Sequence, residues 1–177
     1  MNSELDIRWV QDFGTRYEDA WNSQQPRLIE PLVDVEIRWR DPALPQPATG
    51  LREVQEFFES IWRAFPDHHI DFLPWLEDPF ISADGGACAV SWQSTGTFTG
   101  EMDTTSLKPT NRSFHLDGID LWRFRNGRLW TVQSFYDLLG FCRQIGVLPA
   151  RGSATERIAL HIQGLRPVRL ALLRKGA

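Results

Sequence analysis

The spacing of the apolar residues along this chain changes after residue 65. Up to that point, apart from one strand-like segment, apolar residues recur every three to four positions, which is typical of helices with one buried face. From residue 69 to residue 138 they largely alternate with polar residues, which is typical of strands with one buried face. Helices followed by a run of strands predict an α+β domain in which helices cover one face of an antiparallel sheet. At 177 residues, the chain is long enough to bury the core of one such domain.

The expected elements are separated by residues that favour turns. Helices are predicted over residues 5–23 and 51–65, with a shorter helical piece over 26–32. Strands are predicted over residues 33–41, 69–76, 87–99, 112–125 and 128–136. The prolines of "DPALPQPATG" fix the path of the loop after the first strand. The hairpin at "RNGR" can close as a two-residue turn, which turns Ser134 away from the face of Asp120, or as a longer loop with a glycine bulge, which turns it toward that face.

The first strand places a carboxylic acid on its apolar face. Because alternate residues of a strand share a face, Asp41 lies on the same side as four apolar residues, Val33, Val35, Ile37 and Trp39. Burying an ionisable group costs free energy, so a functional role is one explanation for this position. The alternative explanation is an Asx-type turn that Asp41 begins before Pro42.

A later strand repeats this pattern. In "SFHLDGIDLWRF", Asp120 shares a face with Phe114, Leu116, Gly118, Trp122 and Phe124. Tyr17, on the buried side of the first helix, adds a phenol that could reach the same interior. Three polar groups in one apolar space are typical of a catalytic site. Asp120 alone could instead be a buried acid that a backbone donor or Tyr17 satisfies.

The sequence argues against several classes of partner. The chain has 19 basic and 23 acidic residues, a net charge of -4 and no long basic stripe in its body, so we expect no nucleic acid partner. No apolar run approaches the roughly 20 residues that span a bilayer, so we expect no membrane partner. The amino terminus lacks a secretory apolar stretch, so we expect a cytoplasmic location. A small-molecule substrate fits this composition better.

No metal or cofactor motif is found. His68 and His69 are adjacent, so they point to opposite faces of a strand, and no third ligand is spaced to complete a zinc site. Cys88 and Cys142 are interpreted as two buried, reduced thiols. The chain has no Gly-x-Ser-x-Gly elbow, no phosphate-binding glycine loop and no dinucleotide fingerprint. We therefore expect neither a metal nor a cofactor.

The order of these segments resembles a known superfamily. Helix, helix, strand, "RWRDPALPQPATG", helix, "AFPDHHID" and strands ending in "GIDLWRFRNGRLWTVQSFYD" together resemble the NTF2-like superfamily, particularly its SnoaL-like polyketide cyclase branch. "YDLLGFCRQIGVLP" is similar to the closing helix of that branch. The resemblance covers about residues 7–149, and it implies a cone in which a curved sheet wraps around helices and leaves a deep apolar pocket. The fold hosts enzymes, binding proteins and inactive relatives, so it does not by itself imply a reaction.

Two enzyme families within this resemblance imply site residues. In the ketosteroid isomerases, "RYEDAWN" has a counterpart whose tyrosine falls at Tyr17, the general-base aspartate falls at Asp41, and the protonated aspartate of the oxyanion hole falls at Asp120. In the polyketide cyclases, "KPTNRSF" has a close counterpart, but the catalytic aspartate falls at Ser134 and a pocket histidine falls at Asp120. Epoxide hydrolases of similar fold are a third option, although their Asp-Arg-Asp relay has no counterpart here.

The resemblance therefore implies an enzyme that does cofactor-free acid/base chemistry next to a carbonyl. Asp41 removes a proton, Tyr17 and protonated Asp120 hold the enolate oxygen, and the outcome is isomerisation or aldol cyclisation. The chain is rich in aromatic residues, which suit either a core or a pocket for a flat polycyclic, polyketide or terpenoid substrate. The predicted substrate-binding residues are Trp21, Trp39, Phe58, Trp62, Trp92, Trp122, Ser134 and Phe135. The alternative is a non-catalytic module that binds an apolar ligand or a partner in the same cone.

The remaining expectations concern assembly and the carboxyl-terminal tail. The superfamily commonly forms homodimers through the convex face of the sheet, where His115, Asp117, Ile119 and Leu121 could serve. The composition becomes basic from Ala150 on, so residues 1–149 are predicted to form the domain and residues 150–177 a basic extension. The extension is interpreted as solvated or packed on a partner, or alternatively as an amphipathic segment that contacts anionic membrane.

Overall fold

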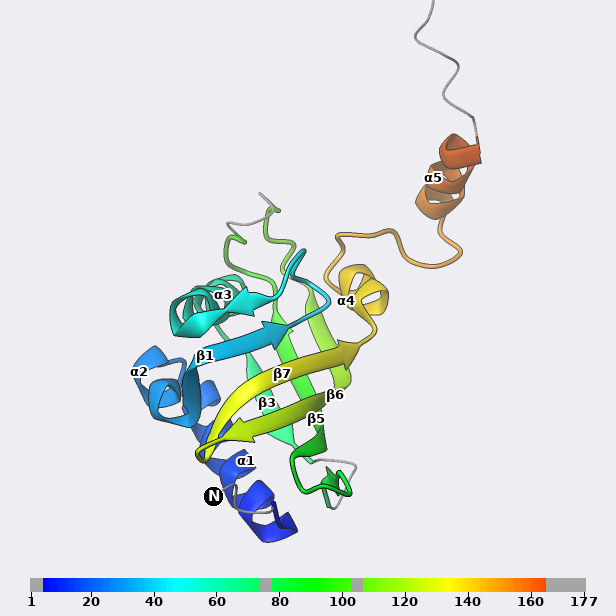
Figure 1. Ribbon diagram of the computed structural model, residues 1–177. Helices are drawn as coiled ribbons and strands as arrows, with labels where there is room; N and C mark the ends of the chain where they lie inside the picture. Colours follow the sequence, from blue (N-terminus) through cyan, green and yellow to red (C-terminus); the bar gives the residue numbers. More distant parts are fainter. Residues whose placement is uncertain (1–4, 74–77, 103–106, 165–177) are drawn as a thin grey trace, which may run out of the picture.

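Residues 5–73, 78–102 and 107–164 are described by the computed structural model, in which a curved, unclosed sheet wraps around helices (Figure 1). This arrangement confirms the predicted α+β cone. The helical elements are α1 (Ile7–Asn22), α2 (Pro26–Ile29), the 3₁₀ turn η1 (Glu30–Leu32), α3 (Gly50–Ala64), α4 (Leu138–Gln144) and α5 (Ala154–Gly164). The strands are β1 (Val33–Arg40), β2 (Ala48–Thr49), β3 (His69–Phe72), β4 (Phe80–Ile81), β5 (Ala87–Thr97), β6 (Ser113–Arg125) and β7 (Arg128–Tyr136). No helix within the described ranges is long and apolar enough to cross a membrane.

The sheet brings the two ends of the predicted domain together. Its strand order is β2-β1-β7-β6-β5-β3, and β4 pairs with β5 outside this path. The pairs are antiparallel except β1 and β7, which run parallel, so the end of β1 before Asp41 lies beside the end of β7. The strand predicted over residues 69–76 ends at Phe72, and residues 74–76 lie outside the described residues.

Helix α1 buries the face that its sequence predicted, and an aspartate caps its first turn. The Asp6 carboxylate caps its first turn by accepting a hydrogen bond from the Trp9 backbone N–H at 2.8 Å. Its inner side is buried at three- and four-residue spacing, by Val10, Phe13, Gly14, Tyr17, Ala20 and Trp21. This apolar stripe packs on the concave face of the sheet, so Tyr17 and Trp21 lie on successive turns that face the interior.

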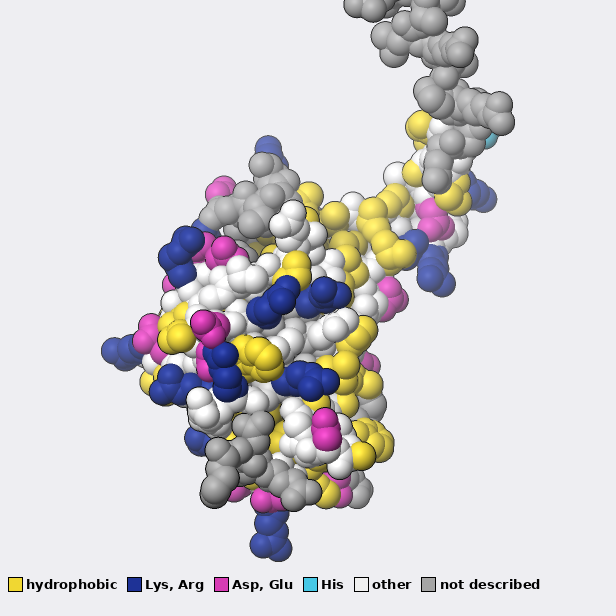
Figure 2. All heavy atoms as spheres, in the orientation of Figure 1, with side chains coloured by type: hydrophobic (Ala, Val, Ile, Leu, Met, Phe, Trp, Pro, Cys, Tyr) yellow, Lys and Arg dark blue, Asp and Glu magenta, His cyan; other side chains and the backbone are white. Residues whose placement is uncertain are grey.

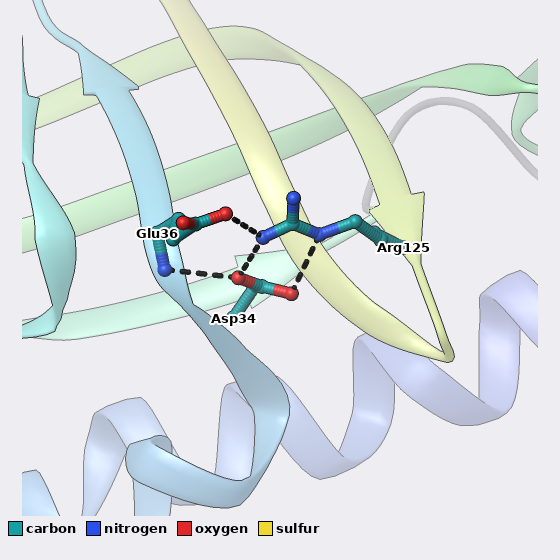
Figure 3. A network of polar contacts seen from close by, with 3 residues as sticks. All are labelled: Asp34, Glu36 and Arg125. Carbon is teal, nitrogen blue, oxygen red and sulfur yellow. Dashed lines mark hydrogen bonds and ion pairs between the residues drawn. The ribbon is translucent and has the colours of Figure 1, made fainter.

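The prediction that Val35 shares the apolar face of the first strand is wrong. Val35 is 65% exposed, because the pairing of β1 with β7 shifts register between Val33 and Arg38. At this point the Asp34 carboxylate accepts a hydrogen bond from the Glu36 backbone N–H at 2.9 Å, so it competes with regular strand pairing. Arg125 donates from Nε to Asp34 at 2.9 Å and from Nη2 to Glu36 at 2.7 Å, and it thereby ties β1 to β6 (Figure 3).

The hairpin between β6 and β7 closes as the two-residue turn, but a bulge within β7 gives Ser134 the orientation that was expected only for the longer loop. Asn126 and Gly127 form a two-residue turn with positive φ angles of 51° and 74°. The pairing then shifts at Trp130, which is an extra residue in β7. This bulge restores the register that places Ser134 directly opposite Asp120, on the same inner face.

The outer face of the sheet carries the residues that were expected there. His115 and Asp117 are exposed, and Leu121 is 43% exposed on the same side of β6. Lys and Arg side chains lie among hydrophobic ones over β1, β6 and β7 in this view (Figure 2). Helix α5, within the predicted extension, lies apart from the sheet (Figure 1), and residues 165–177 of that extension lie outside the described residues.

Candidate active site

A cavity of about 930 Å³ lies inside the cone. It is bounded by the inner faces of α1 and α3, by the proline loop after β1, by α4 and by the concave face of the sheet. Aromatic and aliphatic side chains make up most of its wall, and a few polar groups interrupt them. The volume and the lining are those of a site for a small molecule with several rings.

Asp41 stands at the edge of this cavity, one residue beyond the end of β1. Its Oδ1 accepts hydrogen bonds from the Tyr136 hydroxyl at 2.6 Å and from the Ala43 backbone N–H at 2.8 Å. Within the described ranges, its Oδ2 receives no hydrogen bond. Burial raises the pKa of Asp41, and the two hydrogen bonds oppose that rise. Asp41 therefore forms the Asx-type turn that was considered for it and also keeps one oxygen available to a ligand.

Asp120 lies in the middle of β6 and is 3% exposed. Its Oδ1 accepts a hydrogen bond from Trp92 Nε1 at 2.8 Å, and its Oδ2 accepts one from Trp122 Nε1 at 3.3 Å. Ser134 lies directly opposite Asp120 on β7, and its hydroxyl lowers the pKa of this carboxyl. Burial raises the pKa of Asp120 to about 6 against the opposing effects of Trp92, Ser134 and Trp122, and the negative charge of Asp41 adds to the rise. The donors that satisfy Asp120 are thus side chains of the sheet.

The two acids lie on one row across the sheet. Arg40 pairs with Gln133, so the next residues, Asp41 and Ser134, are neighbours, and Ser134 in turn pairs with Asp120. Two strand spacings place the backbones of the two acids about 10 Å apart. Both acids line the same cavity. The structure therefore brings together the two carboxyls that the sequence placed on separate apolar faces.

Tyr17 extends from α1 into the wall of this cavity. Its ring packs edge-to-face on Trp122 at 5.8 Å, and its hydroxyl is buried without a hydrogen-bond partner among the described residues. Burial raises the pKa of Tyr17 well above its ordinary value, and the charge of Asp120 raises it further. At neutral pH the phenol keeps its proton, so it is an unused hydrogen-bond donor near Asp120.

A separate cluster of polar side chains lies elsewhere on the cavity wall. Trp21 Nε1 donates to His68 Nδ1 at 3.0 Å, and His68 Nε2 lies 2.9 Å from Ser94 Oγ. Burial lowers the pKa of His68 to about 4, so the imidazole is neutral at physiological pH. All three residues line the cavity.

The structure separates the predicted substrate-binding residues into two groups. Those that line the cavity are Trp21, Trp39, Trp92 and Ser134, together with the three predicted catalytic residues. Phe58, Trp62 and Trp122 are buried in the core behind the wall. Phe135 does not line the cavity, because the β7 register turns it to the outer face, where it is 48% exposed.

Several polar residues of the cavity wall were not among the predicted site residues, and three of them take part in the hydrogen bonds described above. Tyr136 shares the inward face of β7 with Ser134, so alternation along that strand would have indicated it once the hairpin register was known. Ser94 lies two residues after Trp92 on β5 and could have been found by the same alternation. His68 was considered only as a metal ligand. Within the described ranges, no cluster of three His, Cys, Asp or Glu side chains could hold a metal ion.

Comparisons with known proteins agree with this architecture. The SnoaL-like polyketide cyclase family matches residues 11–145. TsrD from Streptomyces laurentii is similar in structure, with a TM-score of 0.66 and 23% identity over 82% of this chain and 100% of its own. A SnoaL-like polyketide cyclase from Jannaschia has a TM-score of 0.68 and 16% identity over 84% of this chain and 99% of its own. AclR from Streptomyces galilaeus, described as a hydroxylase, has a TM-score of 0.66 and 16% identity over 90% of this chain and 94% of its own. No curated protein matches the chain.

Proposed function

Because this chain belongs to the SnoaL-like polyketide cyclase family, we propose that it is an enzyme that moves a proton next to a carbonyl group of a polycyclic, polyketide or terpenoid substrate. The observation that carries the proposal is the free oxygen of Asp41 at the edge of an apolar cavity that also holds a second acid and an unpaired phenol. Relatives of this fold include proteins described as cyclases and as a hydroxylase, so the family alone does not choose the reaction.

The two acids differ in what they can do. Each oxygen of Asp120 already accepts a hydrogen bond from a tryptophan, whereas the Oδ2 of Asp41 is unshared within the described part of the chain. Asp41 can therefore take a proton from carbon without first losing a hydrogen bond to the protein. Tyr136 and Ala43 hold the other oxygen and fix the direction in which the carboxylate points. These contacts support Asp41 as the general base.

Proton removal leaves an enolate, whose oxygen needs a hydrogen-bond donor. Tyr17 supplies its unused O–H, and Asp120 supplies a second proton when it is protonated. The pKa of Asp120, already raised to about 6 by burial, rises further as negative charge develops on the enolate oxygen beside it. If protonated Asp41 returns the proton to another carbon of the enolate, the product is an isomer. If the enolate carbon attacks a second carbonyl carbon, a new C–C bond closes a ring and the resulting alkoxide takes the proton.

Exchange of a carbon-bound hydrogen with solvent tests the step that both outcomes share. 2-Tetralone in D₂O, followed by NMR, reports proton removal next to a carbonyl without requiring the natural substrate. The wild type is expected to accelerate the exchange, and Asp41→Asn is expected to reduce that acceleration by about 100- to 10,000-fold. The asparagine keeps a carbonyl oxygen to accept from Tyr136 and Ala43, so Asp41→Asn should unfold close to the wild-type temperature.

The control for this experiment is Asp117→Asn, which removes an exposed acid from the outer face of β6 and should leave exchange unchanged. If Asp41→Asn fails to fold, Asp41 is a structural residue and the proposed base is wrong. If the wild type binds 2-tetralone without accelerating exchange, the chain is a binding module for apolar ligands, an alternative that the mostly apolar wall favours.

We also propose that the chain forms a homodimer through the outer face of the sheet. The apolar side chains that support this face are Leu121, Trp130 and Phe135, all of which are exposed in the single chain. Arg38 and Arg40 lie on the same face of β1, and Asp117 lies on that face of β6, so two copies can bring opposite charges together around the apolar residues.

A further inference from the structure

The Trp21, His68 and Ser94 side chains form a hydrogen-bonded chain whose direction the structure determines. The indole N–H of Trp21 can only donate, so His68 Nδ1 must accept and carries no proton. A neutral imidazole then carries its proton on Nε2, which donates to Ser94 Oγ at 2.9 Å. Burial lowers the pKa of His68, which agrees with a neutral imidazole.

This direction leaves the Ser94 hydroxyl with a proton to donate. Ser94 is 4% exposed and lines the cavity, and His68 is its hydrogen-bond partner in the described part of the chain. Because its oxygen accepts from His68, the hydroxyl proton is free to reach an acceptor atom of a ligand. A purely apolar ligand would leave this proton without an acceptor, which is unfavourable in a buried site.

Ser94 lies far along the cavity from the proposed reacting end. Asp120 pairs with Val90 on β5, and Ser94, four residues further on, pairs with Leu116. Four residues of strand correspond to about 13 Å. Both positions face inward, and the wall between them is apolar apart from the indole N–H that Trp92 donates to Asp120.

The wall between these two positions suits a flat ring system. A Cβ at Gly118 would lie 2.2 Å from the Trp92 ring, so only a glycine lets this indole cover the strand. Trp92 therefore presents a rigid aromatic surface between Asp120 and Ser94. Fused rings that stack on such a surface would align their long axis with the line between the two polar ends.

We propose that Ser94, oriented by His68 and Trp21, is a distal binding site for a second oxygen of an elongated, fused-ring substrate, on the order of 10 Å from the carbonyl oxygen that Asp120 would hold. The proposed function determines only which end of the substrate reacts. The binding of an oxygen by Ser94 does not depend on it. The site takes a ketone, quinone or ether oxygen, because Ser94 offers a donor there. His68 is a positioning residue, since it contacts Ser94 rather than the ligand oxygen.

A matched pair of probes tests this site by binding alone. Equilenin is a steroidal naphthol that carries a ketone at the far end of its four rings, and 17-deoxyequilenin is the same phenol without the ketone. One net hydrogen bond predicts that the wild type binds equilenin about 2- to 10-fold more tightly than the deoxy probe. In Ser94→Ala this ratio should fall to about 1, because equilenin loses its hydrogen bond and the deoxy probe no longer buries an unpaired hydroxyl.

The matched control is Ser91→Ala, which removes a buried hydroxyl from the opposite face of the same strand. This variant should keep the wild-type ratio. In a crystal of the equilenin complex, the ketone oxygen is expected within hydrogen-bond distance of Ser94 Oγ. A ratio that survives in Ser94→Ala, a wild-type ratio of 1, or a ketone seated elsewhere would each overturn the proposal. These readouts do not involve turnover, so they are independent of whether Asp41→Asn abolishes proton exchange.

Discussion

The unpaired hydroxyl of Tyr17 predicts a variant that gains stability while it loses activity. Tyr17→Phe removes the Oη atom and keeps a ring of the same shape, so the contacts with Phe13, Trp21, Phe72 and Trp122 stay in place. A buried polar group without a partner costs about 1–3 kcal/mol, and this hydroxyl is released from that cost when it is removed. The free energy of unfolding of Tyr17→Phe should therefore rise by about 1–2 kcal/mol.

Two measurements check this prediction. Urea titration followed by tryptophan fluorescence gives the free energy of unfolding, and calorimetry should show a Tm higher by about 2–8 °C for a chain of this size. Proton exchange with 2-tetralone should slow by about 100- to 1,000-fold, because an oxyanion donor is lost. If the Tyr17 hydroxyl stabilises the transition state but not the fold, its removal raises the free energy of unfolding and lowers the exchange rate.

Tyr136→Phe is the matched control, because it deletes the same atom at a site where the atom has a partner. The Tyr136 hydroxyl donates to Asp41 at 2.6 Å, and a hydrogen bond to a charged group contributes about 1.5–3 kcal/mol. This variant should lose stability where Tyr17→Phe gains it. If Tyr17→Phe is less stable than the wild type, the Tyr17 hydroxyl has a partner in solution, and it is not an unused donor for the enolate oxygen.

Three further predictions address the wall, the acid and the assembly. Gly118→Ala should cost about 1–3 kcal/mol of stability and weaken equilenin binding, because the added methyl group would displace Trp92. Its control is Gly14→Ala on α1, which should be tolerated because no neighbouring element lies within 4 Å of the added methyl group. Burial raises the pKa of Asp120 from its ordinary 3.8 to about 6, so between these values the folded chain holds a proton that the unfolded chain has released. Urea titrations should show stability falling by roughly 2 kcal/mol from pH 4 to pH 7 relative to Asp120→Asn, and a flat difference would contradict the raised pKa. Leu121→Arg should convert the proposed dimer into a monomer, as measured by light scattering, whereas the control Ile158→Arg on α5 should leave the dimer intact. An unchanged mass for Leu121→Arg would place the interface elsewhere.

Local periodicity was sufficient to predict most of the architecture. The spacing of apolar residues in α1 and α3 and the alternation in β5, β6 and β7 each report which side of one element is buried, and this property is local in sequence. Alternation failed at Val35, where the bonds of Asp34 to Arg125 and to the Glu36 backbone accompany an irregular pairing. Arg125 is 91 residues from Asp34, so no pattern within the strand could have indicated this contact.

The position of Ser134 depended on a single residue. A two-residue turn without a bulge would have paired Asp120 with Gln133, and Ser134 would have faced outward with the opposite set of side chains. The extra residue at Trp130 reverses that outcome, and it also turns Phe135 outward and Tyr136 inward. Asn126 and Gly127 specify the turn type from sequence, but a bulge four residues later has no comparable sequence signal.

The sequence was sufficient to predict which strand face carries each acid. It could not predict the contacts that distinguish the two acids. Tyr136, 95 residues from Asp41, donates to the same oxygen as the Ala43 backbone and so leaves the second oxygen free. The Trp92 and Trp122 indoles donate to different oxygens of Asp120 and so leave neither free. Two aspartates that look equivalent in sequence therefore differ in their capacity to accept a proton from a substrate carbon. Because that difference comes from strand pairing, a variant that shifts the β7 register should impair catalysis even when both acids are retained.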